Sequence, residues 1–338
     1  MTVFVRLAAA LITTLALALP AAASAEVLLP PNGKVYAGLT GGYETTGFER
    51  QTGSHPAVFQ FFGGFDGSLE YIFRGAAEGR SRLAIHLSTD RSGREVITPK
   101  GIATGQGDAY LIKLADRIAL SGSPAYIRLM SEMNCWWNLY SAYLANGRPR
   151  GPQYTTGWYK RAWRRTVVVM RGGPVDDVNR KLRALRLPPV VTDRTELARP
   201  VIAFMWVPQV AGAPDTRANS PRAYWPGKRY VDWVGTDFYS KFPNFAGLER
   251  FYRQFRGKPF MFGEWAIWGR DNPAFVHRFF RWIRGHKRVR MVMYNHGNRS
   301  GGPFRLWRYP RGRAALRAQL RSSRFAPWVP EYAPGHGD

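Results

Sequence analysis

Short apolar runs alternate with helix-like segments along most of the chain, and this alternation is the feature that most constrains the fold. Each run is rich in β-branched or aromatic residues and is bounded by Gly, Pro or Asp, as expected for a strand. The runs are nearly continuous in apolar residues, which is typical of parallel strands buried on both faces. We predict eight strands, at 35–40, 57–63, 83–89, 125–130, 201–207, 231–238, 259–262 and 289–294.

Segments with helical spacing lie between most of these strands, at 67–80, 108–120, 157–171, 245–255, 273–284 and 311–320. Eight alternating units in about 300 residues match the (β/α)8 or TIM barrel, whose usual size is ~250 residues. An open, doubly wound sheet is the competing layout, and periodicity alone does not exclude it. No GxGxxG motif opens a helix after the first strand, which argues against dinucleotide binding.

The two ends of the chain differ from this pattern. Residues 1–25 carry one charged side chain, Arg6, before an apolar run that ends in Ala-Ser-Ala, which predicts a secretory signal peptide. Residues 26–321 are expected to form a single barrel domain, with an extra amphipathic segment at 175–187. Three prolines and two glycines in residues 322–338 predict an irregular tail. No other apolar run is long enough to cross a bilayer, so we expect a secreted, soluble monomer.

The net charge of the chain and the spacing of its histidines indicate which binding partners to expect. The chain has 49 Lys and Arg against 23 Asp and Glu, a net charge of +26 that favours polyanionic surroundings. Residues 278–324 hold 13 Arg, one Lys and no acid, and form either a solvated face or a surface for anionic cell-envelope polymers. No nucleic-acid module is recognisable, so nucleic acid is not expected. The six histidines show no metal-ligand spacing, and the single Cys135 cannot form an internal disulfide.

Two glutamates stand where a barrel carries its chemistry, at the C-terminal ends of strands. Glu132 follows the fourth predicted strand and Glu264 the seventh, and each lies beside tryptophans. Either one alone could be a structural ion-pair partner, for example of Arg128. Two of them, at the ends of the fourth and seventh strands and each beside tryptophans, favour paired acid chemistry, since retaining glycosidases use two carboxyl groups ~5 to 5.5 Å apart.

Several stretches of the sequence resemble glycoside hydrolase family 26, the group that includes β-mannanases. The longest is 97–140, around Glu132, and the others follow the family order through nearly the whole chain. They are VYAGLTGG at 35–42, WVPQ at 206–209, YWPGKRYVDWVGTDFY at 224–239 and KPFMFGEWA at 258–266.

The resemblance implies a (β/α)8 enzyme that hydrolyses β-linked polysaccharide with retention and without a cofactor. It implies that Glu132 is the general acid/base, that Glu264 is the nucleophile, and that Tyr239 donates a hydrogen bond to it. The other residues expected to bind substrate are Arg128, Asn134, Trp137, Trp206 and Trp268, with about half of the tryptophans at 136, 137, 206, 268 and 307 lining the cleft.

Three departures from the family pattern bear on specificity. Cys135 stands where the family usually has glycine, Ser131 where mannanases commonly have histidine, and Gln209 where asparagine is usual. Both glutamates remain, which favours a hydrolase over a binding protein, while the departures argue against assigning mannan firmly. Endo-β-1,4-mannanase-like action is the default expectation. The alternatives are a β-glucanase or β-1,3-xylanase of the same family, and a non-catalytic secreted barrel that binds anionic envelope or matrix polysaccharide.

Overall fold

The computed structural model describes residues 27–42 and 44–334. The predicted signal peptide, residues 1–25, lies outside the described residues.

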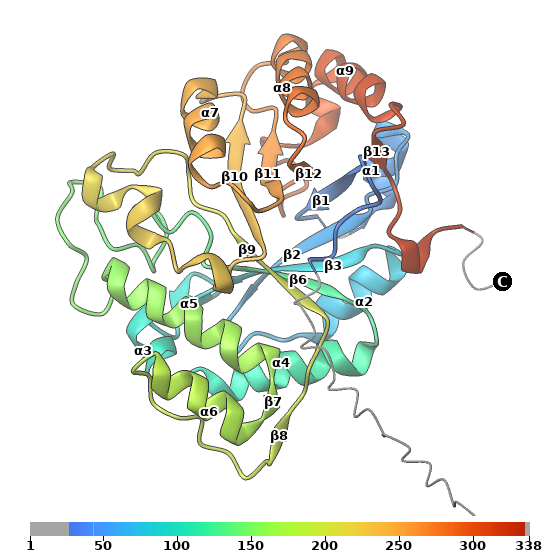
Figure 1. The fold of residues 1–338 in the computed structure, drawn as a ribbon. Coiled ribbons are helices and arrows are strands. Elements are labelled where there is room, and N and C mark those ends of the chain that lie inside the picture. Colours follow the sequence, from blue (N-terminus) through green and yellow to red (C-terminus); the bar gives the residue numbers. More distant parts are fainter. Residues whose placement is uncertain (1–26, 43, 335–338) are drawn as a thin grey trace, which may run out of the picture.

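Eight parallel strands form a closed barrel at the centre of the molecule (Figure 1). Each strand pairs with the next along the chain, and the last pairs with the first, so the barrel has no open edge there. The predicted (β/α)8 fold is therefore confirmed, and the open sheet is excluded. The barrel strands are β1 Val35–Thr40, β2 Val58–Gly64, β3 Arg82–Ser88, β6 Ala125–Leu129, β9 Ile202–Trp206, β10 Trp233–Tyr239, β11 Phe260–Ala266 and β12 Val289–Asn295.

Helices surround the barrel, and all the predicted ones are present within a few residues. They are α2 Glu70–Glu78, α4 Asp108–Ser121, α5 Thr156–Arg171, α6 Val175–Ala184, α7 Phe245–Gln254, α8 Pro273–Gly285 and α9 Pro310–Leu320. Two short helices, α1 Thr46–Thr52 and α3 Pro99–Ala103, were not predicted, because they are too brief to show a helical period.

Short strands and 3-10 turns lie in the loops. A small hairpin pairs β4 Asp90–Arg91 with β5 Arg94–Glu95, and β7 Gly173–Pro174 pairs antiparallel with β8 Glu196–Leu197. This second pair encloses α6, which is the insertion expected before the fifth barrel strand. Five 3-10 turns lie at Arg217–Asn219, Pro221–Tyr224, Lys228–Tyr230, Leu306–Arg308 and Pro330–Tyr332.

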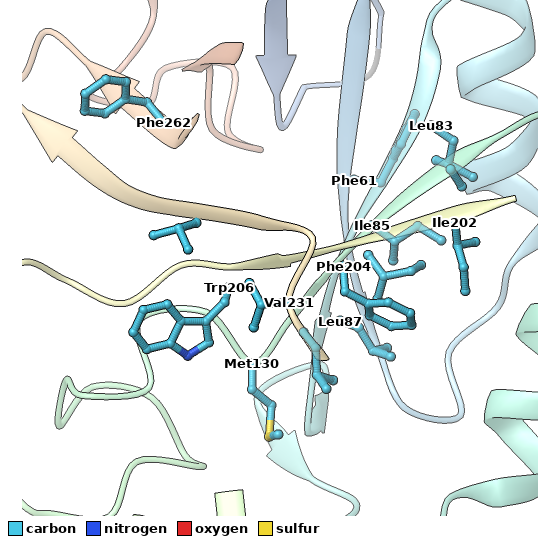
Figure 2. Packing of buried hydrophobic residues seen from close by; sticks show 14 of the residues in the cluster. Phe61, Leu83, Ile85, Leu87, Met130, Ile202, Phe204, Trp206, Val231 and Phe262 are labelled. Carbon is cyan, nitrogen blue, oxygen red and sulfur yellow. The ribbon is translucent and has the colours of Figure 1, made fainter. Parts of the chain in front are cut away.

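The core has two layers because successive side chains of a strand point to opposite faces. The inner layer fills the barrel and includes Tyr126, Met205, Trp233 and Met261. The outer and larger layer lies between the strands and the helices, and Figure 2 shows part of it. A barrel packed in this way is a rigid support for the loops at its ends.

The described part of the C-terminal tail, residues 322–334, is mostly irregular but is held against the barrel by specific contacts. Residues Phe325–Ala326 form strand β13, which pairs with β1. Beyond it, the Glu331 carboxylate accepts two hydrogen bonds from the Arg82 guanidinium, both at 2.7 Å. These contacts join positions 249 residues apart, so local composition could not reveal them.

Candidate active site

A cleft of about 530 Å³ opens at the C-terminal ends of the barrel strands. Its walls come from the ends of β10 and β11 and from the loops that follow β6, β9, β10, β11 and β12. Trp137 also lines a second hollow of about 780 Å³, with Tyr71, His86 and Arg91. The polar and aromatic residues that line the cleft include Glu132, Trp137, Gln209, Asp237, Tyr239, Glu264, Trp268 and Phe304.

Glu264 lies on β11 and accepts hydrogen bonds on both carboxylate oxygens. The Arg128 guanidinium donates to Oε1 at 2.5 Å, and the Tyr239 hydroxyl donates to Oε2 at 2.6 Å. The amide of Asn295, at the end of β12, donates to the same Oε2 at 2.7 Å. Every partner is a donor, so the arrangement suits an ionised carboxylate, which only accepts.

The strands carrying these groups lose their regular register at the site. Pairing of β10 with β11 shifts between Thr236 and Phe238, and pairing of β11 with β12 shifts between Phe262 and Trp265. Such irregularities re-aim side chains next to active sites. Here they fall at Asp237 and Glu264, the acidic residues of these two strands that line the cleft.

Arg128 lies beneath Glu264, is fully buried, and forms an ion pair with Asp237 as well as with Glu264. Burial raises the pKa of the Asp237 carboxyl well above its ordinary value; Arg128 opposes this shift, and the nearby Glu264 and Glu132 add to it. Arg128 was expected to contact substrate. It is instead a positioning residue, because its guanidinium is covered by the two acids it holds.

Gly263 makes room for this cluster. A Cβ at this position would lie 2.8 Å from Arg128 Nε and 2.9 Å from Asp237 Oδ1. Neither the Arg128 guanidinium nor the Asp237 carboxylate can move away easily, since both are buried and form an ion pair with each other.

We expect Gly263→Ala to lower the free energy of unfolding by about 1–3 kcal/mol through overpacking. Urea unfolding measures this effect. Gly285→Ala is the matched control, since a Cβ there meets nothing within 4 Å. Equal stability of the two variants would contradict the proposed crowding.

Glu132 follows β6 and also lines the cleft, and two neutral side chains donate to its carboxyl. The Trp137 indole donates to Oε2 at 2.8 Å and the Gln209 amide to Oε1 at 2.6 Å. The backbone of Glu132 has φ +51°, in the left-handed region that side chains other than glycine rarely adopt. Strain of this kind costs about 1–3 kcal/mol and clusters at functional sites.

Asn134 is fully buried and does not line the cleft. Its amide donates to the Gln209 carbonyl at 2.9 Å, and its carbonyl accepts from the Gln209 backbone N–H at 2.9 Å. Asn134 therefore holds the loop that presents Gln209 to Glu132, and it reaches the site only through that residue. Gln209, which stands where asparagine is usual in the family, is thereby held in position to donate to the Glu132 carboxylate.

The expectation that Trp206 lines the cleft is wrong. Its side chain is fully buried in the outer layer of the core (Figure 2). Its ring centroid lies 4.9 Å from that of Trp225 and 4.8 Å from that of Phe255. Met205 occupies the inner layer, so its neighbour in the strand must face the helices. Of the five tryptophans considered, Trp137 and Trp268 line the cleft.

Sequence reasoning missed Asp237, which pairs with Arg128, and Asn295, which donates to Glu264. Both are polar residues at the ends of apolar strands, a signal that could have identified them.

The sequence analysis also missed His86, which lies on β3 and lines the second hollow. Burial lowers the pKa of His86 well below its ordinary value, and the charge of Arg128 adds to this.

His296 follows Asn295, and burial, aided by the charge of Arg305, lowers its pKa to about 4. In the unfolded chain a histidine has a pKa of about 6.5, so the unfolded state binds the proton more readily between these values. The contribution of neutral His296 is present above pH 6.5 and is lost as pH falls towards 4, by about 3 kcal/mol in all.

We therefore expect the stability difference between the wild type and His296→Gln to shift by about 2 kcal/mol in favour of the variant between pH 7 and pH 4.5. Urea unfolding at the two pH values measures it. A difference that is the same at both would contradict the assignment.

Two searches of the described residues bear on other classes of protein. No group of three or more His, Cys, Asp or Glu side chains in residues 27–42 and 44–334 is arranged to hold a metal ion. Within the same ranges, no helix has the length and apolar character needed to span a membrane.

Comparison with solved structures agrees with the barrel. The chain is similar to Bacillus subtilis mannanase BCman, with a TM-score of 0.55 and 16% identity over 92% of each chain. For a GH26 β-mannanase from Bacteroides ovatus the TM-score is 0.54 and the identity 15%, and the match covers 90% of this chain and 94% of that one. For a modular endo-β-1,4-mannanase from Cellulomonas fimi the TM-score is 0.57 and the identity 16%, and the match covers 91% of this chain and 75% of that one.

No family model and no curated protein matches the sequence. At such low identity, the likeness to solved structures establishes the fold alone. The chain thus has a family 26-like (β/α)8 barrel.

Proposed function

We propose that the protein is a secreted, retaining glycoside hydrolase that cleaves β-linked polysaccharide, with endo-β-1,4-mannanase-like action as the first candidate. The observation that carries this proposal is the pair Glu132 and Glu264, which line one cleft and have different hydrogen-bond partners. Secretion rests on the predicted signal peptide alone.

In the proposed reaction, the Glu264 carboxylate attacks the anomeric carbon while Glu132 gives its proton to the departing glycosidic oxygen. A covalent glycosyl-enzyme results. Glu132 then takes a proton from a water molecule, which attacks the anomeric carbon and releases Glu264. Each step inverts the anomeric centre, so the product keeps the configuration of the substrate.

The surroundings of the two carboxyl groups support this division of roles. Glu264 accepts from the permanently charged Arg128 and from two neutral donors, which keeps both oxygens oriented. Glu132 accepts from the neutral side chains of Trp137 and Gln209 and lies on a separate loop. Trp137 and Trp268 offer flat apolar faces on which sugar rings can lie.

The decisive test is hydrolysis of a panel of purified polysaccharides by residues 26–338. The panel contains β-1,4-mannan, mixed-linkage β-glucan, β-1,3-xylan and an acidic polysaccharide, with reducing ends counted and products sized. We expect new reducing ends on one neutral polymer and oligosaccharide products, with the first anomer seen by NMR being β. Absence of cleavage on every polymer would favour the non-catalytic binding barrel.

A further inference from the structure

The outer surfaces of α8 and α9 carry a concentration of exposed basic side chains. Between Asp271 and Glu331 the sequence contains no acidic residue. We define the α8–α9 basic face by its exposed cationic side chains on the two helices and just beyond their ends, namely Arg278, Arg281, Arg284, Lys287, Arg311, Arg317 and Arg321.

The two helices form one continuous surface. They lie side by side on the outside of the barrel (Figure 1). Gln319 of α9 joins them, because its carbonyl accepts from Arg284 at 2.5 Å and its amide lies 3.3 Å from His277 Nδ1. The basic side chains of the two helices therefore spread over one outer surface, from Arg278, which lies over the Phe245 ring of α7, to Arg317 beside Gly53.

Most cations of this face have no acid close by in the described residues. Some exposed arginines elsewhere pair with acids, as in Arg180 with Asp177 and Arg194 with Asp116, both at 2.7 Å, whereas others, such as Arg161 and Arg183, form no ion pair with a described residue. Of the seven cations of the face, only Arg311 lies within 4 Å of an acid in the described residues, at 3.8 Å from Asp271. The face therefore has a strong local excess of positive charge, beyond the general basicity of the protein.

The other exposed side chains of the two helices indicate what kind of anion fits. Ala274, Gly285, Ala314 and Ala318 are small, so these exposed positions of the two helices carry no large apolar side chain to insert into a lipid layer. Positions on one side of a helix recur about every 5.4 Å, which suits a polymer with regularly repeated anionic groups. An arginine guanidinium also binds a carboxylate or sulfate group through two parallel hydrogen bonds.

We propose that the α8–α9 basic face binds a linear acidic polysaccharide at a site separate from the cleft. No residue of either helix lines the two hollows at the strand ends. The choice of a polysaccharide over another polyanion rests on the proposed function, since an enzyme of β-linked glycans works among such polymers. The face tethers the protein to the acidic polymer while the cleft remains open.

The test measures binding of polygalacturonate to the full mature chain by isothermal titration calorimetry at low and at physiological salt. The variant carries Arg278→Gln, Arg281→Gln, Arg317→Gln and Arg321→Gln. We expect its affinity to fall at least about tenfold, since each exposed contact contributes a modest amount. Wild-type binding should weaken steeply as salt screens the charges within ~10 Å at 0.1 M.

A matched control removes the same total charge from another part of the surface, with Arg161→Gln, Arg180→Gln, Lys181→Gln and Arg183→Gln. Circular dichroism and thermal unfolding verify that both variants fold. Equal loss in both variants would mean that net charge alone drives binding and would overturn the site. Preference for duplex DNA or for anionic lipid vesicles over polygalacturonate would overturn the choice of ligand. Because binding is measured and not hydrolysis, failure of the face leaves the hydrolase proposal standing, and the reverse also holds.

Discussion

Glu264→Ala is expected to lower the hydrolysis of every substrate by about a thousandfold or more, because the glycosyl-enzyme can no longer form. The loss should be the same for a polysaccharide and for an activated aryl β-glycoside, since both need the same nucleophile. Initial rates on both substrates measure it. Sugar binding should persist, because Trp137 and Trp268 still line the cleft.

Glu264→Gln is the matched variant for this experiment. It cannot act as a nucleophile, but it keeps the volume and an acceptor oxygen for Arg128, whose charge is fully buried. Loss of folding in the alanine variant alone would point to the uncovered Arg128 charge and not to chemistry. Substantial polysaccharide hydrolysis by a folded Glu264→Gln protein would contradict the assignment.

Glu132→Ala is expected to reduce hydrolysis in a way that depends on the leaving group. For a polysaccharide the departing hydroxyl needs a proton, and the loss should be about 10²- to 10⁴-fold. For an aryl glycoside with a good leaving group the first step proceeds unaided, so the loss should be much smaller. Comparing the two substrates with wild-type and variant protein measures the difference.

Added azide distinguishes the two roles by stereochemistry. In Glu132→Ala it should attack the glycosyl-enzyme and yield a β-glycosyl azide, with faster turnover. In Glu264→Ala it should attack the aryl β-glycoside directly and yield the α-azide. NMR of the products identifies the anomers, and the same anomer from both variants would show that the roles are misassigned or that the mechanism is not retaining.

The barrel itself could be predicted from the sequence because its signals are local. Apolar runs bounded by turn residues located all eight strands within a few residues, and β1 was placed at its observed bounds. The strand ends then located Glu132 and Glu264, since chemistry gathers at one end of a parallel barrel. The net positive charge and its excess in residues 278–324 are also properties of the sequence alone.

The tertiary structure decided which way side chains point and which distant residues meet. A strand buried on both faces reads as apolar throughout, so its sequence could not show that Met205 faces inward and Trp206 outward. Arg128 meets Glu264 across 136 residues, and Arg82 meets Glu331 across 249. Such contacts depend on the closure of the barrel, because only the completed ring of strands brings these positions together.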